Sequence, residues 1–251
     1  MWLGDRQCGP VRWTSNLGEL VFGGGSTTAL LITDKAAADV RPTYDVDAVA
    51  ESTSYAAYID FSEQLRKLGF TEDTSEGAIC RGRQKKTILD VMPIDEKILG
   101  LSNRWYKPAM DTAQVHELEP GLRVRVVTGV FFLATKLEAF GGRGKNDYLQ
   151  SHDLEDLIAV VDGRAELVEE IKAGPQNART YIASEIKKLL AIGSFVAALP
   201  GYLLPDAAGQ ARISTVTMSA LPSPNAPLLD VDIVEPFFQA ELIDERPRYF
   251  S

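Results

Sequence analysis

The chain has 251 residues, of which 45% are hydrophobic and 24% are charged, and its formal net charge at pH 7 is −9. This composition is that of a folded globular protein and excludes a largely disordered chain, and the acidic balance argues against a general nucleic-acid-binding protein. The two cysteines, Cys8 and Cys80, exclude a disulfide scaffold, and the two histidines, His116 and His152, argue against a histidine-based metal centre.

The apolar runs of the sequence are short, as at residues 130–134 and 195–199, so none is expected to span a membrane. The N-terminus lacks the layout of a signal peptide, because Asp5 and Arg6 precede any apolar run. These features predict a soluble protein of the reducing cytoplasm.

Charge is unevenly distributed along the chain. Residues 151–251 contain 15 acids and 8 bases, whereas residues 80–145 contain 12 bases and 7 acids. The basic segment is compatible with one bound anion, such as a nucleoside triphosphate. The alternative is an ordinary solvated face, which is what most charge runs represent.

The first half of the chain mixes strand and helix patterns. A strand is predicted at 20–22, followed by a glycine turn at 23–25, with Ser26 and Thr27 as N-cap candidates for a short helix. After Pro42 a strand is predicted at 43–49. An amphipathic helix follows at 52–68, ended by Gly69. The remaining elements of this half are three strands and a helix, predicted at 78–80, 86–92, 122–127 and 131–140.

The second half reads as helical. Ser151 or Asp153 can cap a helix whose apolar pattern continues to a stop at Gly174, and a second stripe extends from Ile182 to Val196. The tail contains several prolines and is predicted to be extended. Strands with helices, followed by helices alone, predict an α/β or α+β half followed by a helical half.

Three aspartates carry the main chemical signal. Asp45 and Asp47 are two residues apart in a strand-like run, so their side chains are expected on one face of that strand. Asp90 lies in a second strand-like run between apolar neighbours. If the two strands are adjacent, three carboxylates converge, and such hard oxygen ligands suit Mg²⁺. Two ions held there would clamp the attacking and leaving oxygens of a displacement at phosphorus.

A D-x-D pair alone is weak evidence, since Asp230 and Asp232 repeat it elsewhere in the chain. The glycine turn strengthens the signal. Gly24, Gly25 and Ser26 lie about 20 residues before Asp45, between a predicted strand and a predicted helix, and backbone N–H groups of such a turn attract phosphate. An ordinary tight turn is the alternative, but the joint pattern of turn, D-x-D and a later lone aspartate favours a phosphate-handling site.

These residues resemble the core motif of the DNA polymerase β-type nucleotidyltransferase superfamily. The resemblance covers the Gly-Gly-Ser turn, the run from Arg41 through Thr43 to Asp47, and Leu89-Asp90-Val91. The later Lys136-x-x-Ala-x-x-x-Arg143, followed by a segment with Asp153 and Asp156, is similar to the Lys-Arg-Asp motif of the AbiEii-like branch. That branch includes toxins of bacterial toxin–antitoxin and phage-defence systems.

The resemblance implies specific roles. Gly25 and Ser26, with Gly24, would hold the β/γ-phosphates, and Asp45 and Asp47 would bind Mg²⁺ or Mn²⁺. Asp90 would complete the metal site or act as base on the attacking hydroxyl. The remaining implied site residues would bind the nucleotide. Lys136 and Arg143 would contact phosphate, and Asp153 or Asp156 would orient them. Arg41 and Thr43 belong to the same motif as Asp45 and Asp47.

The sequence departs from the branch pattern between Arg143 and Asp153. This interval is longer than expected, and His152 stands where the branch usually has a basic residue. The implied roles of Lys145, Asp147, His152 and Asp153 are therefore open. Asp153 and Asp156 could instead simply complement the positive end of a helix dipole.

Two further groups were open to either a binding or a structural interpretation. The basic cluster at residues 81–86 could contact RNA or a triphosphate, or form a solvated hairpin. Trp105 and Tyr106, flanked by Arg104 and Lys107, could stack a base or anchor a loop.

The sequence therefore predicts an α+β protein with a nucleotidyltransferase-like mixed sheet and flanking helices, followed by a helical C-terminal half. The predicted divisions are an irregular segment at 1–17, a catalytic domain at 18–135, a helical domain at 136–205 and a proline-rich tail at 206–251. The predicted activity transfers a nucleotidyl group from an NTP to a hydroxyl of RNA, tRNA or protein, with an antitoxin as a further expected partner. The alternatives are a non-catalytic binding module of the same fold and a transferase that acts on a small molecule.

Overall fold

A mixed β-sheet organises the first half of the chain in the computed structural model, which describes residues 20–35, 37–51, 55–73, 81–95, 97, 103–144, 146–207 and 210. The strands form a 7-stranded sheet in the order β3-β4-β5-β2-β1-β7-β6. They are β1 (Val21–Gly23), β2 (Asp45–Ala50), β3 (Thr71–Glu72), β4 (Arg81–Gln84), β5 (Thr87–Pro93), β6 (Gln114–Glu119) and β7 (Leu122–Val126). The β2–β5 and β1–β7 pairs are parallel, and the other pairs are antiparallel.

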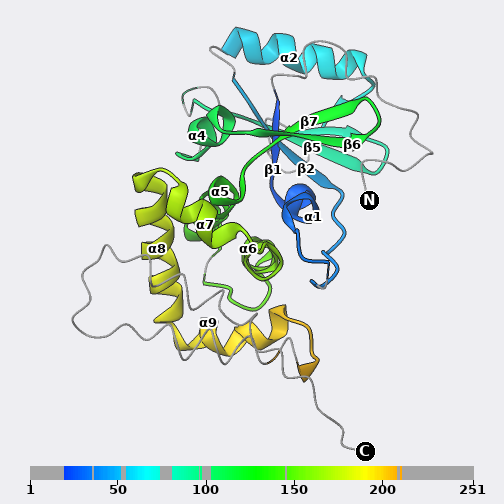
Figure 1. Cartoon of the computed structure of the whole chain (residues 1–251). Helices are drawn as coiled ribbons and strands as arrows, with labels where there is room; N and C mark the ends of the chain where they lie inside the picture. Colours follow the sequence, from blue (N-terminus) through cyan, green and yellow to red (C-terminus); the bar gives the residue numbers. More distant parts are fainter. Residues whose placement is uncertain are drawn as a thin grey trace, which may run out of the picture.

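The helices lie on both faces of this sheet (Figure 1). Among the described helices, α2 (Tyr55–Lys67) covers one face, and the helices of the second half gather on the other. The helical elements on or near that second face are the 3₁₀ turn η2 (Gly25–Thr27), α1 (Thr28–Leu31), α4 (Tyr106–Asp111), α5 (Gly129–Arg143), α6 (His152–Gly163), α7 (Leu167–Ala173), α8 (Gln176–Leu190), α9 (Gly193–Ala198) and η3 (Leu199–Tyr202).

The alternation of β2 divides its side chains between these two faces. Val46, Ala48 and Ala50 belong to the small core under α2, whereas Val49 belongs to the larger core under the helical half. Since successive strand residues point to opposite faces, Asp45 and Asp47 share the face of Val49. The aspartates therefore face the helical half.

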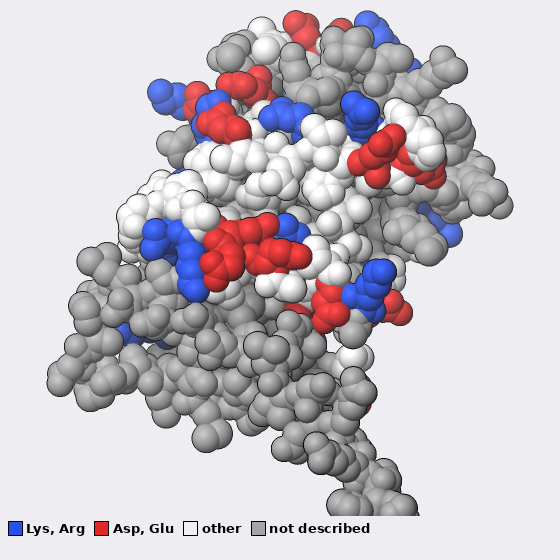
Figure 2. Space-filling model, in the orientation of Figure 1, with Lys and Arg blue, Asp and Glu red and all other residues white. Residues whose placement is uncertain are grey.

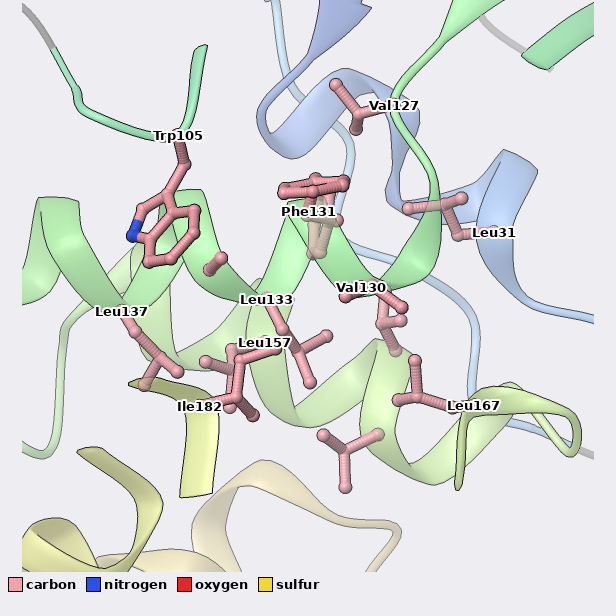
Figure 3. Packing of buried hydrophobic residues seen from close by; sticks show 14 of the residues in the cluster. Leu31, Trp105, Val127, Val130, Phe131, Leu133, Leu137, Leu157, Leu167 and Ile182 are labelled. Atoms are coloured by element: carbon pink, nitrogen blue, oxygen red, sulfur yellow. The ribbon is translucent and has the colours of Figure 1, made fainter. Parts of the chain in front are cut away.

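The larger core is centred on α5. Its residues from Val130 to Ala134 are all buried, as expected for a helix surrounded by other elements. Figure 3 shows Leu133 and Leu137 of this helix on the side of Leu157 and Ile182 from α6 and α8, whereas Phe131 points to the other side, toward Val127 and Leu31. The core thus joins the sheet to the helical half.

The predicted fold class, an α+β protein with a mixed sheet and flanking helices followed by helices, is confirmed. The strands predicted at 43–49, 86–92 and 122–127 are found at 45–50, 87–93 and 122–126. The helix predicted at 52–68 occupies 55–67, and Gly69 with a φ of 89° follows it. Glycine suits this position because it adopts positive φ without a Cβ penalty.

Two local predictions were wrong. The stripe from Ile182 to Val196 is divided between α8 and α9, with a break at Ala191 and Ile192. Ser26 and Thr27 do not cap a helix with their side chains: their hydroxyls donate to the carbonyls of Gly23 and Gly24 at 3.3 and 2.9 Å. By contrast, Ser151 does cap α6 and accepts a hydrogen bond from the Leu154 N–H.

The domain division stays a prediction. α5 contains the predicted boundary at residues 135 and 136. Residues 1–19, the strand predicted at 78–80 and the tail from 211 onward lie outside the described residues. Among the described helices, none is both long and apolar enough to traverse a bilayer.

Candidate active site

A single row of paired residues crosses the middle of the sheet. Gly23 of β1 pairs with Asp47 of β2, Asp47 pairs with Asp90 of β5, and Asp90 pairs with Arg81 of β4. Laterally paired residues present their side chains on the same face, so Asp47, Asp90 and Arg81 stand side by side toward the helical half. The two aspartate strands are therefore adjacent, which is the condition that the sequence left open for convergence of the carboxylates.

Asp90 is already bound within the protein. Its two carboxylate oxygens each accept a hydrogen bond from the Arg81 guanidinium, from Nε and from Nη2, both at 2.8 Å. This is the two-pronged geometry in which arginine binds carboxylates most strongly. Within the described residues, no three His, Cys, Asp or Glu side chains are grouped closely enough to hold a metal ion. The expected convergence of three carboxylates is therefore not found in this arrangement.

Asp47 lies directly against the glycine turn. Gly24 has φ 63° and ψ −167°, a conformation that is essentially restricted to glycine. A Cβ built on Gly24 would lie 1.8 Å from Oδ2 of Asp47. The Gly-Gly-Ser turn and the D-x-D strand are thus in direct contact, as the joint pattern in the sequence predicts.

Burial raises the pKa of Asp47 from 3.8 to about 6. The positive charges of Lys136 and Arg143 oppose this rise, and the carboxylates of Asp90 and Asp45 add to it. A carboxylate in such surroundings is stabilised in its charged form by a bound cation. The donor set fits one hard divalent ion, because Asp45 and Asp47 supply carboxylate oxygens and Mg²⁺ commonly uses only one or two of them with substrate phosphates.

A buried ion-pair network lies next to the glycine turn. Lys136 of α5 donates to Asp156 at 2.7 Å and to Asp153 at 3.1 Å, and all three side chains are at most 9% exposed. A Cβ on Gly25 would lie 2.9 Å from Oδ2 of Asp156, so the network touches the turn.

Two arginines extend this network toward solvent. Arg143 donates to both oxygens of Asp153 at 2.9 and 3.0 Å, while its side chain stays 73% exposed. Burial opposes the effect, but the bonds from Arg143 and Lys136 hold the pKa of Asp153 below its usual value. Arg41 pairs with Glu155 at 3.1 Å and with Asp156 at 3.7 Å.

A recess lies beside Arg41, between the segment 38–41, α6 and η3. Its polar lining consists of Asp39, Arg41, Glu155, Asp156, Asp162 and Tyr202. Thr43 lies near the start of β2, where its hydroxyl accepts a hydrogen bond from the Asp45 N–H at 3.1 Å. The run from Arg41 to Asp47 therefore connects this recess with the acidic row.

The two groups that the sequence left open have structural contacts. Arg81 and Arg83 of the hairpin pair with Asp90 and Asp73. Trp105 is 5% exposed and packs against Phe131 and Tyr181, so it anchors a loop rather than offering an open stacking surface. Figure 2 shows acidic and basic groups next to one another on the described part of one face, so that face gives no preference for an RNA acceptor.

Sequence reasoning missed the role of Arg81 as the partner of Asp90. The register of the hairpin produces this contact, because the turn at Lys85 and Lys86 pairs Gln84 with Thr87 and so places Arg81 opposite Asp90. Two lysines are not a characteristic turn sequence, so the sequence carried no signal for this register. Sequence reasoning also missed Glu155, which binds Arg41, and His152, whose Nδ1 lies 3.1 Å from Glu155. Lys145 lies outside the described residues.

Comparison with known proteins gives little support for a family. No protein-family model matches the chain, and no curated protein matches it. A similar solved structure is a tRNA nucleotidyltransferase complexed with a primer tRNA and an incoming ATP analog. The identity is 16% and the TM-score 0.26, over 80% of this chain and 66% of that chain, just under two thirds of its length. A likeness this weak carries no argument about function.

Proposed function

We propose that the protein is a Mg²⁺-dependent nucleotidyltransferase. The observation that carries the proposal is the contact between Gly24 and Asp47. It places a Gly-Gly-Ser turn, of the kind that binds phosphate, against the carboxylate pair of Asp45 and Asp47. In the proposed reaction an acceptor hydroxyl oxygen bonds to the α-phosphorus of an NTP. The bond from that phosphorus to the β-phosphate oxygen breaks, pyrophosphate leaves, and the hydroxyl proton passes to a carboxylate or to water.

Each group of the site has a role in this proposal. Asp45 and Asp47 hold the divalent ion, Mg²⁺ or Mn²⁺. Of the two roles expected for Asp90, a third ligand or the base, its pairing with Arg81 favours the base. When bound, the ion neutralises charge on the triphosphate and on the reacting oxygens. Gly24, Gly25 and Ser26 receive the β/γ-phosphates through the backbone N–H groups of their turn.

The cationic side chains act at different distances from the nucleotide. Arg143 keeps an exposed guanidinium that can bind phosphate with two N–H groups, and Asp153 orients it. Lys136 is held between Asp153 and Asp156, so it acts as a fixed positive charge near Asp47. Arg41 lies beside Gly25, where a phosphate on the turn would be within its reach, and Thr43 fixes the chain that leads into β2.

The acceptor and the biological role are extensions of this proposal. The acceptor is a hydroxyl of RNA, such as a tRNA end, or of a protein side chain. A toxin role in a toxin–antitoxin or phage-defence system follows from the resemblance of the Lys-Arg-Asp motif, and it implies an antitoxin partner. Growth arrest on induced expression, relieved in the Asp45→Asn, Asp47→Asn variant, is the result this role requires.

The experiment that tests the activity is label transfer. Purified protein is incubated with each α-³²P-labelled NTP, Mg²⁺, total RNA and cell extract, and the products are separated before and after nuclease or protease treatment. The variant Asp45→Asn, Asp47→Asn is run in parallel with Asp230→Asn, Asp232→Asn, a second D-x-D pair of this chain, as matched control.

Label that enters RNA or protein with the wild type and the control, but not with the site variant, supports the proposal and identifies the acceptor class. Label found only in small products indicates a small-molecule acceptor. Nucleotide binding without transfer to any product would favour a binding module and contradict the enzyme.

A further inference from the structure

Arg81 is the last residue of the paired row Gly23, Asp47, Asp90 and Arg81, at the end away from the glycine turn. Its guanidinium is bound to both oxygens of Asp90, and the side chains of Arg81 and Asp90 are only 22% and 16% exposed. A two-pronged pair with this degree of burial is held in one geometry, unlike a solvent-exposed ion pair. The charge of Asp90 is therefore balanced within the protein.

Resting on the proposed function, we infer that the site binds a single divalent cation, at Asp45 and Asp47, and that Arg81 supplies the positive charge that a second cation would bring to Asp90. Arg81 is thus a positioning residue of the site. With one divalent ion, the three carboxylates and the guanidinium reach local neutrality before the triphosphate binds.

Geometry disfavours a second ion on Asp90. An Mg²⁺ ion binds carboxylate oxygen at about 2.1 Å, and each of these oxygens already accepts an Arg81 N–H at 2.8 Å. A cation on either oxygen would therefore lie within about 5 Å of a guanidinium nitrogen, a like-charge contact in a partly buried place. The positive charges that act on Asp47 belong to Lys136 and Arg143. Lys136 is bound by Asp153 and Asp156, and Arg143 is bound by Asp153, so these two cations are balanced by other carboxylates.

The next arginine on the same strand provides the contrast. Arg83 of β4 binds Asp73 at 2.7 Å, and its Cα partner on β5 is Ile88 rather than an aspartate. Arg83 therefore has the same strand and charge as Arg81 and also binds one aspartate, through a single carboxylate oxygen, but it lies outside the carboxylate row. It is the matched control for Arg81.

The test counts Mn²⁺ ions by electron paramagnetic resonance in the full chain, with α,β-methylene-ATP present. Two Mn²⁺ ions in one site would lie about 3.5–4 Å apart and give a spin-coupled spectrum, whereas one ion gives an isolated signal. The proteins are the wild type, Arg81→Gln, Arg81→Lys and Arg83→Gln, each checked for folding by circular dichroism.

The inference expects one isolated Mn²⁺ in the wild type, Arg83→Gln and Arg81→Lys, and a coupled pair in Arg81→Gln. A coupled pair in the wild type would overturn it, even if Arg81→Gln fails to fold, and so would a single ion in folded Arg81→Gln. Absence of protein-bound Mn²⁺ from the wild type would instead contradict the proposed function itself.

Discussion

Gly24 and Asp47 lie so close together that only glycine fits at position 24. The Gly24 backbone has a φ of 63°, and the position of its missing Cβ lies 1.8 Å from Oδ2 of Asp47. Glycine is therefore required at position 24 for two reasons. The backbone conformation is one that is essentially restricted to glycine, and a side chain here would overlap the Asp47 carboxylate. The turn and the carboxylate form one unit.

Replacing Gly24 by alanine is predicted to destabilise the protein and to abolish nucleotide binding. Backbone strain of this kind costs about 1–3 kcal/mol, and displacement of the Asp47 carboxylate adds to it. Urea denaturation measures the loss of stability. The control is Gly121→Ala, which shares a positive φ but whose Cβ would meet nothing within 4 Å. Equal losses in the two variants would show that contact with Asp47 contributes nothing.

The stability of the metal-free protein is predicted to depend on pH through Asp47. The pKa of this group rises from 3.8 to about 6 on folding, so between these values the folded state binds more protons than the unfolded state. The free energy of unfolding therefore falls as pH rises from about 4 to 6, by on the order of 3 kcal/mol from this group.

Asp47→Asn removes that contribution and provides the measurement. In EDTA at pH 7.5 the variant is expected to exceed the wild type in the free energy of unfolding, and the difference should shrink as pH falls from about 6 to 4. The groups that act on Asp47 are Lys136, Asp90, Arg143 and Asp45, and they are common to both proteins. A difference that stays constant with pH contradicts the raised pKa.

Much of the fold was predictable because the spacing of apolar residues along this chain matches the period of the helices and strands that they form. The alternation in the run from Asp45 to Ala50 predicts a strand with one polar face, and the structure divides those side chains between two cores. The break at Ala191 and Ile192 was not predictable in the same way, since neither residue is a strong helix breaker. The apolar stripe continues across it.

The candidate site was predictable in its residues but not in its internal contacts. Asp47 and Asp90 were identified as residues that would converge if their strands were neighbours. The binding of Arg81 to Asp90, by contrast, depends on the hairpin register at Lys85 and Lys86. The caps predicted at Ser26 and Thr27 failed because η2 leads directly into α1, so the hydroxyls find preceding carbonyls instead. The residue type indicates which side chains are able to cap a helix, whereas the local backbone geometry determines which hydrogen bond the side chain forms.

Lys136→Met is predicted to cost about 3–5 kcal/mol of stability, because it leaves the buried carboxylates of Asp153 and Asp156 without their shared partner. The matched control is Lys188→Met, which breaks an exposed pair with Glu185 and should cost no more than about 1 kcal/mol. Chemical denaturation compares the two. A Lys136 variant as stable as the Lys188 variant would mean that the buried network does not contribute to folding.

Magnesium is predicted to stabilise the folded protein through Asp45 and Asp47. A ligand that binds only the folded state adds about 2.7 kcal/mol at a concentration of 100 times its Kd. A cation on Asp47 also offsets the repulsion from Asp45 and Asp90 that raises its pKa. Thermal unfolding at pH 7.5 should therefore show a higher Tm with Mg²⁺ than with EDTA, and Asp45→Asn, Asp47→Asn should lose that increase. Asp230→Asn, Asp232→Asn, which makes the same change in the second D-x-D pair of the sequence, should retain it. An equal increase in the wild type and the site variant would place the cation elsewhere and contradict the assignment of Asp45 and Asp47 as its ligands.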